Sequence, residues 1–197
     1  MKYLKLSMLV PALFFSNTFA QATNLNTVKT DPESGIYLTA ADYKEKQLHL
    51  AGDQSTNNKL RVNDFFGGKT LTLNHNGQRH EFSKDSIYGY RAQDGNDYRF
   101  YKSYSSPYKI LESGSLVIYE IKQPGNKQNG FKPIIRYYFS DGADGEVNLL
   151  SLANLKNTFK DQPAFDIIAN NFQTDHDLIT YDDYHHMFRI NRLLAKL

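Results

Sequence analysis

The chain has 197 residues, no cysteine and a formal net charge of +2. Without cysteine it can form no disulfide, and it cannot carry the lipid-modified cysteine of a bacterial lipoprotein. Lys2 and Lys5 account for the whole net charge, because 21 basic and 21 acidic side chains remain from residue 23 onward. That balance removes the net-charge argument for binding to nucleic acid or to an acidic membrane surface, which requires many uncompensated cations, and we expect no nucleic-acid partner.

The first 22 residues have the three parts of a secretory signal peptide. Two lysines precede a mostly apolar run at 6–15, and Ala20-Gln21-Ala22 has the small-residue pattern of a cleavage site. The apolar run is about half of the roughly 20 residues that span a bilayer, so we expect it to be removed and not to anchor the chain. The sequence therefore predicts an exported protein, periplasmic or extracellular, that is not a lipoprotein and has no membrane span in its mature form.

The segment 23–34 is polar and contains Asp31-Pro32, which predicts a flexible N-terminal arm. A first strand is expected at 36–38. Thr39 and Asp42 then have the spacing of a capping box, in which each side chain bonds to the backbone N–H of the other residue. This pair predicts a short helix through Gln47.

From 59 to 140 apolar residues recur at every second position, which is the period of a strand with one buried face. Turn signals such as Asn76-Gly77, Asp94-Gly95 and Ser113-Gly114 divide this segment into short strands. We therefore predict a β domain at 35–140 that is largely antiparallel and forms a small β-barrel or a curled sheet.

After residue 140 the apolar spacing becomes helical, which predicts an α+β fold with about three C-terminal helices packed on the β domain. One helix lies within 147–159, a second begins at Pro163 and ends near Phe172, and a third covers about 177–197. Residues 23–140 carry 16 basic and 12 acidic side chains, whereas 141–197 carry 5 and 9. These opposite charges favour docking of the helical segment 141–197 on the β domain as one folded unit.

Two aromatic runs flank Asp94-Gly95 and form the most distinctive short stretch of the sequence. A two-residue loop there would place Gly89 opposite Phe100, and Tyr90 opposite Arg99. The candidates for a stacking platform that binds a sugar or another small ligand are Tyr88, Tyr90, Tyr98 and Arg99. The alternative is aromatic packing that fixes the register of the sheet, and the absence of tryptophan weakens the sugar-binding interpretation.

Two pairs of side chains have weak metal-binding character. A two-residue hairpin at Asn76-Gly77 places His75 and His80 on one face, but zinc needs at least a third ligand. Asp182 and His186 are four residues apart on the predicted third helix. Neither pair completes a metal motif, so we expect no metal and no cofactor.

The sequence contains no nucleophile elbow, phosphate-binding loop or dinucleotide fingerprint. The preferred function is a non-enzymatic binding protein of the cell envelope, with a protein or another envelope component as its partner. One alternative is a hydrolase that acts on envelope or extracellular polymers, and a second is a small-ligand or glycan-binding module. A hydrolase would draw its titratable groups from His75, His80, Asp97 and Glu112.

Five segments together resemble uncharacterised exported proteins of Bacteroidota: GIYLTAADY at 35–43, DSIYGY at 85–90, DYRF at 97–100, YYFS at 137–140 and NRLL at 191–194. The resemblance covers nearly all of residues 23–197. It implies export from a Gram-negative cell and a discrete domain type. It implies no activity, ligand or site residue.

Overall fold

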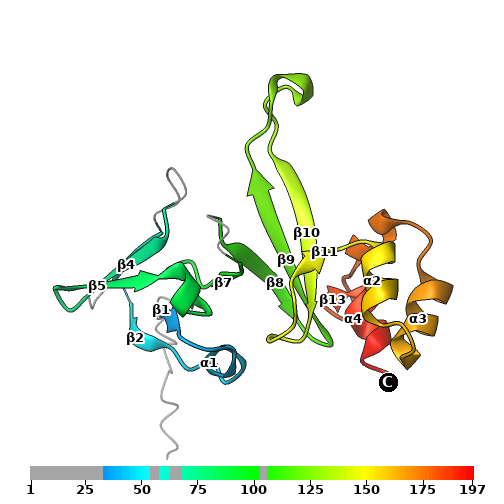
Figure 1. Ribbon diagram of the computed structural model, residues 1–197, viewed down its shortest axis with the longest axis horizontal. Coiled ribbons are helices and arrows are strands. Elements are labelled where there is room, and N and C mark those ends of the chain that lie inside the picture. The colour runs from blue at the N-terminus through cyan, green and yellow to red at the C-terminus, as the bar shows by residue number, and fades with distance from the viewer. Residues whose placement is uncertain (1–32, 54–57, 63–67, 103–105) are drawn as a thin grey trace, which may run out of the picture. The chain divides into compact units, whose positions relative to one another are not determined.

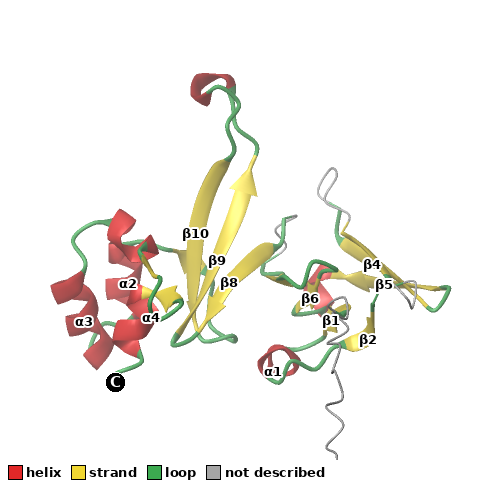
Figure 2. Cartoon of the chain, turned by 180° about the vertical axis from the view of Figure 1, so that it is seen from behind, coloured by secondary structure: helices red, strands yellow, loops and turns green. Residues whose placement is uncertain are grey.

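The computed structural model describes residues 33–53, 58–62, 68–102 and 106–197, and Figures 1 and 2 show them from opposite sides. The predicted signal peptide and most of the predicted arm lie outside these residues. Residues 31–197 form one unit by their internal contacts. The described chain has mostly antiparallel strands and four α-helices, which confirms the predicted α+β class.

The N-terminal part of the described chain is mostly strand. Its elements are β1 (Ser34–Tyr37), α1 (Ala40–Lys44), β2 (His49–Gly52), β3 (Lys59–Val62), β4 (Thr70–His75), β5 (Gln78–Ser83), the 3-10 helix η2 (Lys84–Ser86), β6 (Gly89–Arg91), β7 (Asp97–Arg99) and β8 (Tyr108–Ser113). The predicted capping box before α1 is confirmed, because Asp42 N donates to Thr39 Oγ1 and Thr39 N donates to the Asp42 carboxylate. The helix ends before Gln47, since Lys46 takes a positive φ of 56°.

A long hairpin and the helical segment complete the chain. The elements are β9 (Leu116–Gln123), the 3-10 helix η3 (Lys127–Asn129), β10 (Ile134–Asp141), β11 (Asn148–Leu149), α2 (Leu152–Thr158), α3 (Pro163–Asn171), the 3-10 helix η4 (Asp175–Ile179), β12 (Tyr181–Asp182), β13 (Met187–Phe188) and α4 (Arg189–Leu194). The first two predicted helices are confirmed as α2 and α3, and Pro163 lies in the first turn of α3 as expected.

The third predicted helix is wrong over most of its length. Only Arg189–Leu194 is α-helical, whereas the residues before it form η4 and the β12–β13 ladder. His186 takes a positive φ of 52° between these two strands, which a continuous right-handed helix does not allow. The apolar residues that suggested one helical face therefore come from a strand, with Phe188, and from a short helix, with Ile190.

The main sheet has eight strands in the order β11-β10-β9-β8-β7-β6-β1-β2, and β3-β4-β5 form a separate sheet. Because β11 and β2 lie at opposite edges of the main sheet, the sheet is open. The predicted β-barrel is therefore wrong, whereas a curled sheet is compatible with this order. Alternating residues predict strands, but closure depends on strand tilt and register, which the pattern does not contain.

The two predicted tight hairpins differ in loop length. At Asn76-Gly77 the loop has the two residues expected, and His75 pairs with Gln78 across it. The loop at Asp94-Gly95 is longer by one residue, because Ala92 N donates to Asn96 O over 2.9 Å. The φ of 80° at Gly95 is typical of such a three-residue loop.

The longer loop shifts the register of the β6–β7 hairpin. Gly89 lies opposite Arg99 and Tyr90 lies opposite Tyr98, so the predicted pairing of Gly89 with Phe100 is wrong. A Cβ atom at Gly89 would lie 1.9 Å from Tyr98 O. Glycine is therefore required by the close approach of two backbones and not by an aromatic ring that covers it.

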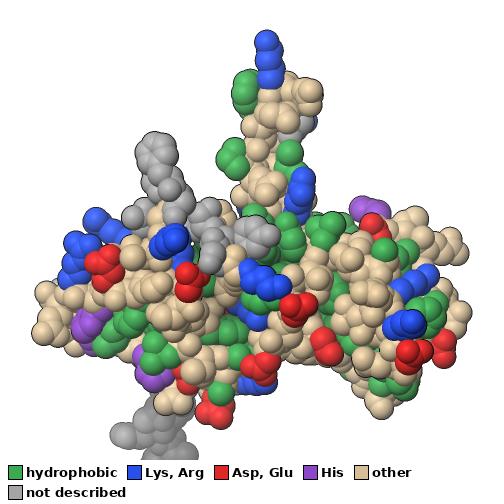
Figure 3. All heavy atoms as spheres, viewed as in Figure 1, with side chains coloured by type: hydrophobic (Ala, Val, Ile, Leu, Met, Phe, Trp, Pro, Cys, Tyr) green, Lys and Arg blue, Asp and Glu red, His purple; other side chains and the backbone are tan. Residues whose placement is uncertain are grey.

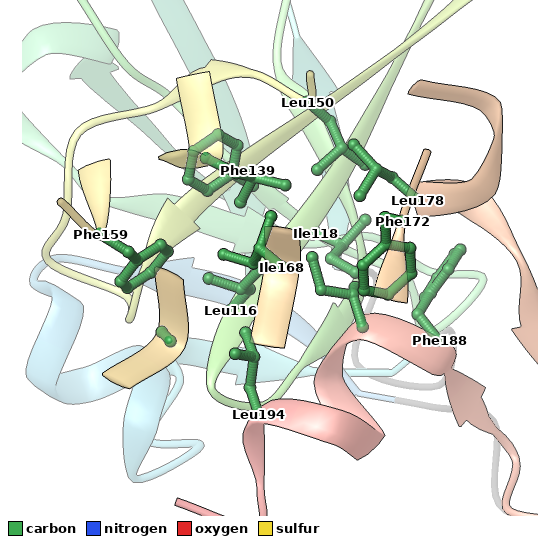
Figure 4. Packing of buried hydrophobic residues seen from close by; sticks show 13 residues of the cluster. Leu116, Ile118, Phe139, Leu150, Phe159, Ile168, Phe172, Leu178, Phe188 and Leu194 are labelled. Carbon is green, nitrogen blue, oxygen red and sulfur yellow. The ribbon is translucent and has the colours of Figure 1, made fainter. Parts of the chain in front are cut away.

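Successive residues of β9 fill cores on the two faces of the sheet. Leu116 and Ile118 are fully buried in a cluster with the helical residues, and Figure 4 shows them near Phe139 and Ile168. Val117 and Tyr119 belong to a different cluster. Because side chains alternate along a strand, β9 ties both cores to one backbone.

A buried amide joins α4 to the β8–β9 hairpin. Asn191 is 1% exposed, accepts from Leu116 N over 2.7 Å and donates to Leu116 O over 3.0 Å. Its amide also donates to Glu112 Oε1 over 2.5 Å, while Glu112 Oε2 accepts from Phe188 N over 2.7 Å. Every polar atom of this junction therefore has a partner across 75 or more residues of sequence.

Replacement of Asn191 by alanine is predicted to lower the free energy of unfolding by about 3 kcal/mol, because it removes the acceptor of the buried Leu116 N–H and a donor to the Glu112 carboxylate. Urea unfolding at neutral pH measures the change. Asn157→Ala is the matched control, since Asn157 is an exposed asparagine of α2. Equal stability of the two variants would contradict the role of the junction.

Candidate functional site

Arg99 of β7 lies in a cage of tyrosine rings. Arg99 is only 5% exposed. Its Cζ lies 5.1 Å, 5.0 Å and 5.9 Å from the ring centres of Tyr88, Tyr101 and Tyr119. Nη1 donates to Tyr119 Oη over 2.8 Å and Nη2 donates to Gly145 O over 3.0 Å. Ring faces and neutral acceptors thus replace most of the water that this buried cation loses, while its Nε is buried without a hydrogen-bond partner among the described residues.

The residues of the predicted stacking platform are separated into two pairs. Tyr88 packs on the Arg99 guanidinium, whereas Tyr90 stacks on Tyr98 with ring centres 4.9 Å apart and planes at 7°. Tyr88, Tyr90 and Arg99 are buried, and Tyr98 is half-buried. Desolvation by burial raises the pKa of Tyr88, which keeps its hydroxyl protonated. These side chains therefore present no open aromatic face to a sugar ring.

His75 of the β4–β5 hairpin serves a structural contact. His75 Nδ1 lies 2.7 Å from Oδ1 of Asn58, and the Asn58 amide donates to Ser34 O over 3.1 Å. His80 lies opposite Leu73 in the ladder, as predicted. Among the described residues, no group of three or more histidine, aspartate and glutamate side chains is arranged to hold a metal ion.

The predicted pairing of Asp182 with His186 is wrong, because these residues lie on a strand and in the turn after it. Asp182 Oδ2 lies 2.9 Å from His185 Nδ1 and 2.9 Å from Arg192 Nε. The hydrogen bonds from His185 hold the pKa of Asp182 below its ordinary value. This carboxylate therefore fixes the β12–β13 turn against α4.

Asp97, a candidate of the hydrolase hypothesis, is surrounded by donors. It accepts from Arg91 Nε over 2.8 Å, from Tyr37 Oη over 3.0 Å and from Lys46 Nζ over 3.2 Å. Burial alone would raise its pKa, but the hydrogen bonds and charges of Arg91 and Lys46 hold the pKa below its ordinary value. A carboxylate held ionised in this way is a structural anion and a poor proton donor.

The other hydrolase candidates belong to separate networks. Glu112 is engaged at the α4 junction, and His75 is engaged with Asn58. A surface hollow of about 900 Å³ lies beside α2 and α3, and its lining includes Lys160, Asp161 and Phe165 but none of the predicted site residues. The structure thus brings together no acid, base and nucleophile from the predicted set.

The end of the β9–β10 hairpin, residues 122–136, is the feature that sequence reasoning missed. Pairing with β8 stops at Glu120, and β11 pairs only with Tyr138 and Phe139. The hairpin end therefore pairs only with itself among the described residues. In Figures 1 and 2 it extends past β8 and β11.

The hairpin end is strongly basic. Its exposed cations are Lys122, Lys127, Lys132 and Arg136, and no acidic residue occurs from Ile121 to Ser140. In Figure 3 blue side chains lie along this projection, and no red side chain lies between them on the face shown. This cluster of cations is visible in the sequence. A charge count over 23–140 hides it, because residues 23–120 in the same count are neutral.

Phe131 lies at the turn of the hairpin end and is 72% exposed. Its N–H donates to Asn126 O over 2.8 Å, and its φ is 60°. A positive φ is unusual for a bulky side chain, and glycine or asparagine adopts it more readily. An exposed aromatic ring thus occupies a position that the local backbone does not favour, which points to a role outside folding.

Comparison with known proteins finds no match to a family model, a curated protein or a solved structure. The resemblance to exported Bacteroidota proteins stays a prediction. In the described part of the chain, no helix is long and apolar enough to cross a membrane.

Asp97→Asn is predicted to destabilise the fold by about 2 kcal/mol at pH 7, because Arg91 and Lys46 lose their anion. Since the folded-state pKa of Asp97 is lowered, its contribution is complete above the unfolded pKa of about 3.9 and disappears as pH falls further. Urea unfolding between pH 7 and pH 3 should show the difference from wild type narrowing at the acid end. Asp183→Asn, at an exposed carboxylate, should show a small difference at every pH.

Proposed function

We propose that the protein is an exported, non-enzymatic binding protein of the cell envelope that engages a negatively charged partner through the hairpin end. The observation that carries this proposal is the gathering of four exposed cations at 122–136, a segment that contains no acidic residue. Lys122, at its start, lies 3.5 Å from the carboxylate of Glu120. The signal-peptide pattern at 1–22 supports export.

Local charge matters more than net charge at the distances involved. Residues 23–120 carry 12 basic and 12 acidic side chains, so the hairpin end holds the whole positive excess of the β segment. Exposed charges are screened beyond a Debye length of about 8 Å at physiological salt. A partner at the hairpin end is therefore attracted by these cations, although the net charge of residues 23–197 is zero.

The hydrolase and glycan-binding alternatives have less support. Each would need catalytic groups or aromatic faces that converge on a hollow, whereas Asp97, Glu112 and His75 are engaged in structural contacts. Tyr88 and Tyr90 are buried. Most described residues of the hairpin end, in contrast, are exposed, and none belongs to the apolar clusters of the described residues.

A triple variant of the hairpin end, Lys122→Gln with Lys127→Gln and Lys132→Gln, tests this proposal. We predict that its binding to the partner is reduced about tenfold or more. The tagged protein, residues 23–197, is used to capture material from an envelope extract of the producing cell. Retained protein is identified by mass spectrometry and retained lipid by chromatography. Capture should be strong in about 0.1 M salt and weak in about 1 M, where the Debye length falls from about 10 Å to about 3 Å.

The matched control is Lys59→Gln with Lys160→Gln and Lys196→Gln, three exposed lysines outside the hairpin end. Both triple variants have the same net charge, so any difference between them reports position. Equal retention by the two variants, or capture that does not respond to salt, contradicts the proposed function.

A further inference from the structure

We propose that the negatively charged partner is a lipid bilayer surface with anionic headgroups, onto which the hairpin end docks with Phe131 inserted among the outer acyl chains. This inference rests on the proposed function and specifies its ligand. It follows from the arrangement of charge around the hairpin, the position of the aromatic ring and the length of the projection.

The cations lie on both faces of the hairpin. Lys122 pairs directly with Ile135, so their side chains share one face, and Arg136 is the next residue and points to the other. A polypeptide bound to one face would meet only part of this charge. A charged layer approached by the tip of the hairpin attracts the cations of both faces alike, whether they enter the layer or remain above it.

The outermost part of the projection, residues 124–133, carries no charge apart from two lysines, and Phe131 is its one large apolar side chain. Phe131 is 72% exposed, and Pro124 and Pro133 are exposed beside it. Lys127 and Lys132 lie on either side of Phe131 in the sequence. Long lysine stems let an ammonium group remain at the phosphate level while a neighbouring ring enters the hydrocarbon boundary.

The spacing of the remaining cations fits the same orientation. At about 3.3 Å per strand residue, Arg136 lies roughly 16 Å from the level of Phe131, and Lys122 lies near the same level as Arg136 because it pairs with Ile135. These two cations would remain outside the headgroup layer, within one to two Debye lengths of it. They add attraction without having to be desolvated.

The conformation of the tip is set by the backbone and not by the aromatic ring. Gly125 has its Cβ position only 2.0 Å from Lys132 O, so the two arms approach too closely for any side chain there. The Phe131 N–H bond to Asn126 O closes the turn whatever the side chain at 131. The ring can therefore be exchanged while the turn is kept, which makes the inference testable without unfolding the protein.

Phe131→Trp provides the direct test, because the natural chain contains no tryptophan. With residues 23–197, the single indole is predicted to shift its emission to the blue when vesicles of phosphatidylcholine with about 30% phosphatidylglycerol are added. Lipids brominated on the acyl chain should quench this emission. Tyr184→Trp is the matched control, since Tyr184 is 88% exposed and lies outside the hairpin, and its emission should not change.

Phe131→Asn separates insertion from folding. Asparagine adopts the positive φ readily, so the urea midpoint should equal or exceed that of wild type. Sedimentation with the same vesicles should show affinity reduced about tenfold or more, because the buried ring surface is lost. The Lys122, Lys127 and Lys132 triple variant should lose roughly fivefold for each of Lys127 and Lys132 and less for Lys122, which lies farther from the membrane surface. Tyr184→Asn should bind as wild type does.

Two results overturn the inference. One is unchanged emission of the Phe131→Trp variant when anionic vesicles are added, and the other is equal vesicle affinity of the Phe131→Asn variant and wild type. A reporter that responds to poly-L-glutamate and not to vesicles also overturns it, and assigns the hairpin end to an acidic protein. That last result leaves the proposed function intact, whereas equal capture by the two lysine variants removes the proposed function itself.

Discussion

The antiparallel ladder between β9 and β10 is the constraint on which the rest of the structure depends. It runs without interruption from the pair Leu116–Asp141 to the pair Gln123–Ile134. At its first end, β9 supplies Ile118 to the helical core and Tyr119 to the core on the other face. At its far end, no other strand of the described chain pairs with either arm. One set of hydrogen bonds therefore holds both the packed interior and the projecting basic hairpin.

Elements fixed by local signals could be predicted from the sequence, whereas elements fixed by distant partners could not. The capping box at Thr39 and the first-turn Pro163 act within a few residues, so α1 and α3 start where expected. The loop at Asp94-Gly95 leads into Asp97, which bonds Tyr37 across 60 residues. The residues after 177 leave the helical path where Glu112 bonds Phe188 N across 76 residues. No window of sequence contains both members of such pairs.

The same distinction explains the candidate sites. Arg99 and Tyr88 were singled out by the aromatic pattern and do meet, but their role depends on Tyr119 and on the carbonyl of Gly145, which the chain brings from far away. The sequence shows the hairpin end as a cluster of cations without acids. That this cluster lies on a projecting element follows only from the strand pairing, in which both arms of the hairpin end pair only with each other among the described residues. The net charge gave no sign of this cluster, because a sum over the chain carries no information on position.

The hairpin end belongs to no apolar cluster of the described chain, so the stability of the fold places few requirements on its side chains. Mutations between residues 122 and 136 meet a backbone requirement at Gly125 and little else, because the side chains there support no core. The sequence of this hairpin can thus change while the sheet and helices stay constant. The hairpin is a natural position for grafting a new binding sequence onto this scaffold.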